Sequence, residues 1–116
     1  TLFSIEERIQ MIKDVTKNYP KTEVHEFSGL LITYVQEVNA CTILRGLRAI
    51  SDFEHEFQMA SINKRLNPSV ETLFMMTNES YFFLSSSSVK ELAALGCNLK
   101  GFVPELIAKK LRERLL

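Results

Sequence analysis

The sequence predicts one α/β domain built on an open parallel sheet. Its 116 residues are enough for a single domain. A content of 46% hydrophobic and 24% charged residues is typical of globular proteins. Segments with the apolar spacing of helices alternate along the chain with short β-branched runs. Because strands separated by helices pair in parallel through right-handed crossovers, we expect three short strands covered by helices.

The first half of the chain is predicted to contain two helices and two strands. Ser4 and Glu7 form the pattern of a capping box, and apolar residues then recur at helical spacing. Thr22–Phe27 alternates apolar and polar residues as a strand does, and Leu30–Val38 has the apolar side of a helix. Cys41–Leu44 is apolar and β-branched, which is the composition of a buried strand.

The second half is predicted to contain one strand and three helices. A second capping-box pattern, at Ser51 and Glu54, predicts a helix over Asp52–Asn67. The remaining elements are, in chain order, a strand over Glu71–Met76, a helix over about Ser86–Leu95 and a helix from Pro104 to the end. Three strands make a small sheet, so we expect an exposed parallel edge where one more strand–helix–strand step would sit.

Charge and cysteine usage exclude several classes of protein. Fourteen Lys and Arg balance fourteen Asp and Glu, whereas binders of nucleic acids or membrane surfaces need a net basic face. Cys41 and Cys97 lack the spacing of metal ligands, and two cysteines cannot build a disulfide framework. We therefore expect reduced thiols and a cytoplasmic protein without nucleic-acid or membrane partners. The chain begins with Thr1 and has no signal-peptide pattern, which suggests a processed or truncated sequence.

Two arginines follow the predicted strand Cys41–Leu44. Arg45 and Arg48 flank Gly46, and ligands of open α/β sheets bind where strands end. Guanidinium groups match the geometry of phosphate, and a glycine allows a ligand to approach the backbone closely. The pattern therefore favours a phosphate site, although two solvated arginines in an ordinary turn would have the same sequence.

A run of four serines, Ser85–Ser88, precedes the predicted helix near Val89. Small hydroxyl residues at a helix start expose unpaired backbone N–H groups, and the helix dipole favours an anion there. Simple N-capping by one serine would explain part of this run but not all four residues. We expect the backbone of Ser85–Ser87 to bind an anion and the side chain of Ser88 to contribute little.

Three other features give weaker signals. His55 lies within a predicted helix and either lines the site or faces water. The aromatic residues Tyr81–Phe83 either cover a nucleotide base or pack in the core. The basic residues of the last helix are expected to form a solvated face that complements the helix dipole.

Four blocks of the sequence together resemble the phosphopantetheine adenylyltransferase family. The blocks occur in order and extend over essentially the whole chain: Phe3–Arg8, Ile43–Glu54, Met59–Lys64 and Leu84–Glu91. The second block, in which the arginine–glycine pattern runs into Asp-Phe-Glu, is highly specific to this family. The resemblance implies a Rossmann-like nucleotidyltransferase fold that transfers the adenylyl group of ATP to 4′-phosphopantetheine, releasing pyrophosphate and forming dephospho-coenzyme A.

The resemblance also implies a set of binding residues. The expected ATP contacts are Gly46, Leu47, Arg48, Glu56, Tyr81, Phe82, Phe83, Leu84, Ser85, Ser86 and Ser87. The expected phosphopantetheine contacts are Leu31, Arg45, Met59 and Asn63. The family further implies Mg²⁺ as cofactor with no protein metal ligand in this chain, coenzyme A as a feedback ligand, and a homohexamer in the cytoplasm.

The chain departs from the family pattern in two places. His55 stands where the family usually has Tyr. The first strand of the family, with its Gly-His loop and catalytic histidine, has no counterpart, so we expect residues 1–116 to be the C-terminal portion of the fold, without a catalytic residue. Two alternatives are a non-catalytic nucleotide- or coenzyme-A-binding fragment and another nucleotidyltransferase, such as a cytidylyltransferase, whose equivalent block is threonine-rich.

Overall fold

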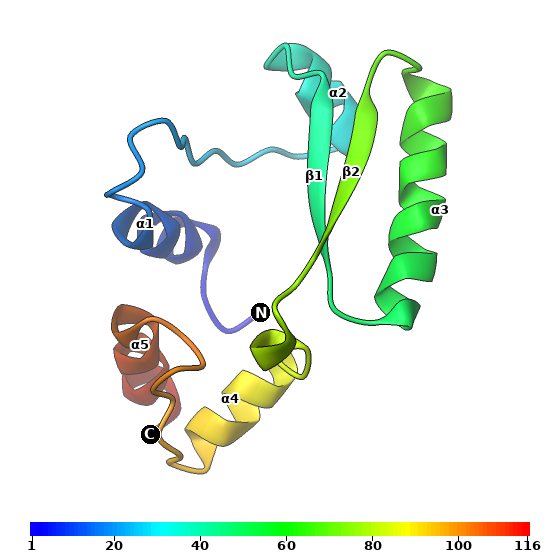
Figure 1. Ribbon diagram of the computed structural model, residues 1–116. Helices are drawn as coiled ribbons and strands as arrows, with labels where there is room; N and C mark the ends of the chain where they lie inside the picture. The colour runs from blue at the N-terminus through cyan, green and yellow to red at the C-terminus, as the bar shows by residue number, and fades with distance from the viewer. The chain divides into compact units, whose positions relative to one another are not determined.

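The computed structural model describes all residues from Thr1 to Leu116 and divides the chain into two compact units. The central unit is Phe27–Phe83. The terminal unit combines the two ends of the chain, Thr1–Glu26 and Leu84–Leu116. Helices and strands alternate within the central unit, as expected for the α/β class (Figure 1). No helix is long and apolar enough to cross a membrane.

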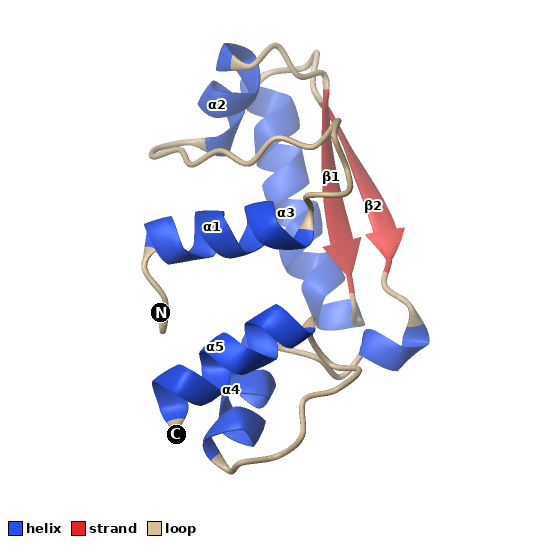
Figure 2. Cartoon of the chain, turned by 90° about the vertical axis from the view of Figure 1, so that its left-hand side faces the viewer, coloured by secondary structure: helices blue, strands red, loops and turns tan.

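The central unit contains a parallel sheet of two strands, β1 (Thr42–Leu47) and β2 (Glu71–Met76). Figure 2 shows them side by side, and they pair in register from Thr42↔Glu71 to Leu47↔Met76. The crossover between them is α3 (Ile50–Leu66), and α2 (Leu31–Glu37) precedes β1. The rings of Phe53 on α3 and Phe74 on β2 meet edge to face with centroids 5.9 Å apart, which fixes α3 against the sheet.

The expected strand over Thr22–Phe27 is wrong, because this segment pairs with neither strand of the sheet. A single extended segment gains nothing from strand geometry unless its N–H and C=O groups find a neighbouring strand. Phe27 instead stacks on Tyr34 of α2, with ring centroids 4.9 Å apart. The alternation read from the sequence therefore reflects one aromatic anchor at the start of the central unit, and the sheet has two strands instead of three.

The terminal unit packs α4 (Ser86–Ala94) against α5 (Glu105–Leu115), and α1 (Ile5–Val15) also contacts α5. Its core consists of five buried residues: Val89, Ala93, Leu99, Ala108 and Leu111. Gly96 ends the α4 region with φ +76°, as the sequence predicted.

Arg114 connects α5 to the N-terminal segment of the chain. Its guanidinium donates to the carbonyl of Leu2 at 2.9 Å, pairs with Glu7 and lies 5.1 Å from the centre of the Phe3 ring. The Ser4 backbone N–H and this arginine lower the pKa of Glu7. The capping box of Ser4 and Glu7 is present as predicted.

Candidate functional site

The phosphate-binding pattern begins inside β1 and not after it. The strand extends to Leu47, so Arg45 and Gly46 are strand residues and only Arg48 follows. Parallel pairing explains the longer strand, because Arg45 lies opposite Phe74 and Gly46 opposite Met75 in the ladder with β2. A Cβ added to Gly46 would meet no atom within 4 Å. The space beside this part of the backbone is therefore open, as close approach of a ligand requires.

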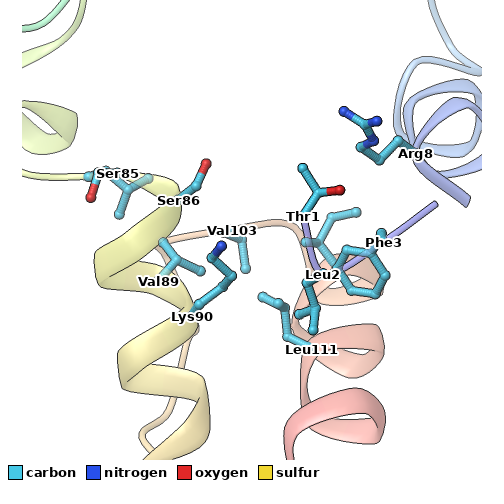
Figure 3. Close-up of a pocket in the computed structure, with 12 residues that line it drawn as sticks. Thr1, Leu2, Phe3, Arg8, Ser85, Ser86, Val89, Lys90, Val103 and Leu111 are labelled. Carbon is cyan, nitrogen blue, oxygen red and sulfur yellow. The ribbon is translucent and has the colours of Figure 1, made fainter. Parts of the chain in front are cut away.

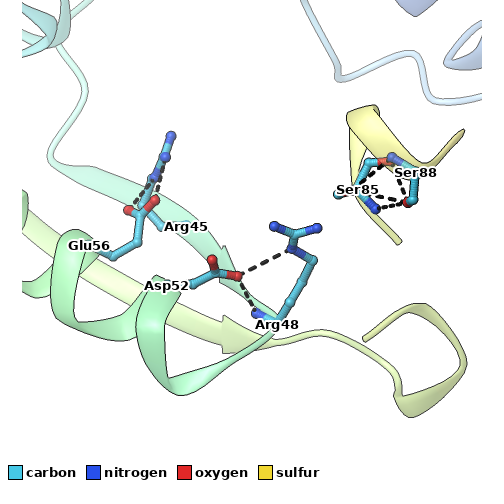
Figure 4. Close-up of polar contacts among 6 residues, drawn as sticks. All are labelled: Arg45, Arg48, Asp52, Glu56, Ser85 and Ser88. Carbon is cyan, nitrogen blue, oxygen red and sulfur yellow. Dashed lines mark hydrogen bonds and ion pairs between the residues drawn. The ribbon is translucent and has the colours of Figure 1, made fainter. Parts of the chain in front are cut away.

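Arg45 forms a two-point ion pair with Glu56 of α3 (Figure 4). Its Nε donates to Oε2 at 2.7 Å, and its Nη2 donates to Oε1 at 2.6 Å. These hydrogen bonds lower the pKa of Glu56 and raise that of Arg45. A folded-state pKa below the unfolded value means that the pair stabilises the protein above the carboxylate's ordinary pKa and is lost as the pH falls through the lowered value.

Arg48 also pairs with an acid of α3, Asp52, through both its backbone and its side chain. The Asp52 Oδ2 atom accepts from the backbone N–H of Arg48 at 3.3 Å and from its Nε at 3.2 Å (Figure 4). The expected capping box of Ser51 and Glu54 is wrong, because α3 begins earlier, at Ile50, and has no side-chain cap. Asp52 in the first turn supplies the acceptor instead, and it holds Arg48 at the junction between β1 and α3.

A cavity of about 180 Å³ in the central unit collects the residues expected at phosphopantetheine. Its lining includes all four of them, namely Leu31, Arg45, Met59 and Asn63. These residues come from α2, β1 and α3, so their meeting is a product of the fold and not of sequence spacing. His55 and Glu56 also line the cavity. His55 therefore lines this cavity and is also exposed to water.

Asn63 is the one buried polar residue of the chain, with 8% of its surface exposed. Its side chain lines the cavity, and no polar side-chain atom of the chain is both buried and without a hydrogen-bond partner. A carboxamide carries two N–H donors and a carbonyl acceptor. Asn63 therefore places an amide beside a ligand's polar group in this cavity without leaving an unsatisfied polar atom in the core.

Ser85 and Ser88, the first and last of the four serines, form a reciprocal cap at the start of α4 (Figure 4). The Ser88 N–H donates to the Ser85 Oγ at 3.1 Å, and the Ser85 N–H donates to the Ser88 Oγ at 3.0 Å. Ser88 therefore has a structural role in the cap that was not predicted from the sequence. The capping box was not recognisable in the sequence, because serine stands at the third helical position, where Glu or Gln is usual.

The caps leave the backbone N–H groups of Ser86 and Ser87 without an acceptor in the protein. Ser85 and Ser86 border a cavity of about 470 Å³ in the terminal unit, with Arg8 and Lys90 among the lining side chains (Figure 3). Apolar residues such as Leu2 and Val89 line much of the rest of this cavity. Free N–H groups, a helix N-terminus and two cationic side chains together favour an anion at this opening.

We expect Ser88→Ala to lower the free energy of unfolding by about 1 kcal/mol, because it removes one half of the α4 cap. Ser87→Ala is the matched control, since the Ser87 side chain has no hydrogen bond in the cap. Urea unfolding followed by circular dichroism compares the two variants. Equal stabilities would contradict the assignment of Ser88 to the cap.

The aromatic residues before α4 are exposed and do not form part of the core. Tyr81, Phe82 and Phe83 keep 43%, 40% and 61% of their surface exposed, around the short 3₁₀ helix Glu79–Tyr81. The interpretation that they pack in the core is therefore wrong. Their exposure is consistent with the alternative, in which an aromatic face covers a base.

Comparison with known proteins decides the family. Residues 1–92 match the family model described as cytidylyltransferase-like. A phosphopantetheine adenylyltransferase of Caldanaerobacter subterraneus is 57% identical over 97% of this chain and 71% of its own length. The chain belongs to the phosphopantetheine adenylyltransferase family. The family, the nucleotidyltransferase fold and the enzyme class expected from the four sequence blocks are thereby confirmed.

Two further members of the phosphopantetheine adenylyltransferase family are similar to this chain to the same degree. The enzyme of Carboxydothermus hydrogenoformans is 54% identical over 97% of the chain and 70% of its own length. That of Desulfatibacillum aliphaticivorans is 51% identical over 98% of the chain and 65% of its own length. The chain thus spans about two thirds of the length of the curated relatives it matches.

Sequence reasoning missed the pair between Arg45 and Glu56. The two residues are eleven positions apart and lie on a strand and a helix, so neither helical nor strand periodicity brings them together. The only signal in the sequence was the opposite charge of the two residues. Arg45 lies within the block Ile43–Glu54, and Glu56 follows the end of that block by two residues. Packing of α3 along β1 was needed to show that they meet.

Proposed function

We propose that this chain provides the substrate-binding part of a phosphopantetheine adenylyltransferase. The reaction joins the phosphate of 4′-phosphopantetheine to the AMP portion of ATP. The observation that carries the proposal is the central-unit cavity, because it gathers Leu31, Arg45, Met59 and Asn63 from three separate elements. The side chains that line it suit a ligand with an anionic end and an arm that contains both methylene and amide groups.

Each residue of this cavity has a chemical role in the proposal. Arg45 binds the phosphate of phosphopantetheine, because a guanidinium offers several N–H donors to phosphate oxygens. Leu31 and Met59 pack against the methylene groups of the arm. The amide of Asn63, which lines the cavity, hydrogen-bonds an amide of the arm. His55 borders the same space.

ATP is assigned to the residues that follow β1 and precede α4. Arg48 binds the polyphosphate, and Gly46 and Leu47 allow the nucleotide to approach the open face of the strand. Ser85, Ser86 and Ser87 bind phosphate oxygens chiefly through backbone N–H groups. The exposed rings of Tyr81–Phe83 and the partly buried Leu84 cover the nucleoside. Glu56, which the family resemblance assigns to ATP, also accepts hydrogen bonds from Arg45 with both carboxylate oxygens.

In this mechanism a phosphate oxygen of phosphopantetheine attacks the α-phosphorus of ATP. A new P–O bond forms, the bond between the α-phosphorus and the β-bridging oxygen breaks, and pyrophosphate leaves with that oxygen. The protein residues hold the reactants in line and neutralise the charge that spreads over the phosphoryl oxygens. No side chain of this chain is assigned as a catalytic residue.

Mg²⁺ is proposed as a companion of ATP, not as a resident of the protein. The chain has no group of three or more His, Cys, Asp or Glu residues that could hold a metal ion. Magnesium commonly keeps several waters and binds through phosphates with one or two carboxylates. In this proposal the phosphates of ATP carry the ion into the site.

Assembly, regulation and location belong to the same proposal. A homohexamer and feedback binding of coenzyme A follow from the family resemblance, and coenzyme A shares the phosphopantetheine portion of the product. The free and exposed thiols of Cys41 and Cys97 support a reducing, cytoplasmic location.

A pyrophosphate-release assay with two nucleotide donors tests the proposal. With 4′-phosphopantetheine as acceptor, the full protein should turn over ATP at least about 100-fold faster than CTP, because a few lost base contacts are worth this factor. CTP is the relevant competitor because the matching family model is described as cytidylyltransferase-like. Faster turnover of CTP would replace the adenylyl proposal with the cytidylyl alternative.

A further inference from the structure

One face of α3 carries three of the side chains that line the central-unit cavity. His55, Met59 and Asn63 follow one another at intervals of four residues, so they form a row along the helix. At about 1.5 Å per residue, the row is about 12 Å long. The cavity therefore extends along α3, with His55 at the end of the row nearer the start of the helix.

The anionic end of phosphopantetheine belongs at the His55 end of this row. Arg45 lies near the carboxyl end of β1 and pairs with Glu56, the residue that follows His55. Asn63, which is assigned to an amide of the arm, lies at the other end of the row. A ligand whose phosphate meets Arg45 therefore places that phosphate near His55 and extends its arm past Met59.

The fixed charges at this end of the cavity cancel. Arg45 of β1 and Glu56 of α3 bring one charge each to the lining. The lining residues from α2 and β2, Leu31 and Thr72, are uncharged. Hydrogen bonds from Arg45 lower the pKa of Glu56 most, and the charges of Arg45 and His55 lower it further, so this carboxylate is ionised. The pair thus offers no net charge to a phosphate monoester, which carries about −1.5 to −2 at neutral pH.

His55 is the group of the lining that can change this balance near neutral pH. Histidine is the side chain whose charge ordinarily changes between about pH 5 and 8. His55 is exposed, so a proton can reach it from solvent. Asp52, one turn earlier on α3, pairs with Arg48 and lies outside the cavity lining. A proton on His55 adds a positive charge near the phosphate, and the phosphate in turn favours the protonated imidazole.

We infer that His55 takes up a proton when phosphopantetheine binds and thereby supplies positive charge to the substrate phosphate. The inference rests on the proposed function, which assigns the cavity to phosphopantetheine. The proton comes from solvent, and no bond of the substrate is made or broken. Because uptake becomes harder as the pH rises, the affinity for phosphopantetheine should fall above neutral pH, where the phosphate is already ionised. Tyr, the usual residue of the family at this position, cannot supply this charge.

Calorimetric titration of 4′-phosphopantetheine in two buffers of different ionisation enthalpy, Hepes and Tris, measures the proton uptake. The full wild-type protein should take up about half a proton at about pH 7, and its Kd should rise about threefold between about pH 7 and 8.5. His55→Gln and His55→Tyr should take up essentially no proton and keep the same Kd over this range. His55→Lys, whose charge persists at high pH, should bind more tightly than wild type at about pH 8.5 and also without proton uptake.

Two controls separate this effect from other titrations. His25→Gln removes the other histidine of this chain, which lies in the terminal unit and pairs with Glu23, and it should leave the proton uptake unchanged. Pantetheine lacks the phosphate, so it should bind without taking up a proton. Far-ultraviolet circular dichroism confirms that each variant is folded.

The outcomes distinguish the inference from the function on which it rests. Equal proton uptake by wild type and His55→Gln, or equal uptake with pantetheine and phosphopantetheine, would overturn the inference. Normal wild-type binding without proton uptake would overturn the inference alone. Wild-type protein that binds no phosphopantetheine would overturn the proposed function and this inference with it.

Discussion

Arg48→Ala is expected to weaken ATP binding by about 2–4 kcal/mol, and Arg45→Ala is expected to weaken phosphopantetheine by a similar amount. Arg48 follows β1 and is held by Asp52 at the junction with α3, whereas Arg45 lines the cavity that contains Asn63. Removing the Arg48 side chain leaves its backbone N–H bond to Asp52, so the start of α3 should persist. The two variants should therefore fail on different substrates while both remain folded.

Calorimetry with each ligand against each variant measures this selectivity. Arg65→Ala is the matched control, because Arg65 is exposed in the last turn of α3 and lines none of the cavities. Its affinities for both ligands should stay within about twofold of wild type, as is usual for exposed sites without special contacts. Equal losses of both ligands in Arg45→Ala and Arg48→Ala, or losses on the opposite substrates, would contradict the division of roles.

Ser86→Pro is expected to lower the rate of pyrophosphate release about 100-fold, the usual effect of removing one backbone donor to a reacting oxyanion. Ser86 is the first residue of α4, where proline fits a helix well. The preceding Ser85 has φ −128° and ψ 160°, the extended conformation that a residue before proline prefers. The substitution therefore deletes the free N–H of Ser86 and leaves α4 able to form.

Ser86→Ala is the comparison that isolates the backbone, because it removes the hydroxyl and keeps the N–H. We expect its rate to stay within about threefold of wild type. Far-ultraviolet circular dichroism and the Tm of the two variants show whether α4 is intact. If Ser86→Ala were as slow as a folded Ser86→Pro, the hydroxyl would be the binding group and the backbone role would be wrong.

Local signals in the sequence predicted the elements that depend on local interactions. Three elements were predicted in this way: the start of α1 from the Ser4 capping box, the end of α4 from Gly96, and β2 (Glu71–Met76) from its apolar composition. These features involve neighbours within a few residues, where a side chain and the backbone of one helical turn determine the outcome. The parallel pairing also followed, because one helix between two strands permits little else.

The misassigned elements depend on partners distant in sequence. Thr22–Phe27 has the alternation of a strand but no strand beside it. The start of α3 is set by Arg48 and Asp52, which meet only after β1 has extended through Arg45 in its ladder with β2. The secondary-structure propensity of a segment does not depend on hydrogen-bond partners that lie far away in the sequence, so it cannot predict elements that need them.

The candidate site shows the same division. The types of residue at the phosphate positions, Arg45, Arg48 and the serine run, suffice to suggest anion chemistry from sequence alone. The assembly of the cavity around the buried amide of Asn63 needs the packing of α2, β1 and α3. The Arg45–Glu56 pair likewise needs the strand and the helix to be in place.

Transfer of radioactive phosphorus from α-labelled ATP tests the central claim most directly. With 4′-phosphopantetheine and the full protein, the label should move into dephospho-coenzyme A in an amount equal to the pyrophosphate released. Acid-quenched protein incubated with labelled ATP alone should carry no label, because the substrate phosphate is the only nucleophile in the proposed reaction. Label on the protein, or release of pyrophosphate without labelled dephospho-coenzyme A, would contradict direct adenylyl transfer to phosphopantetheine.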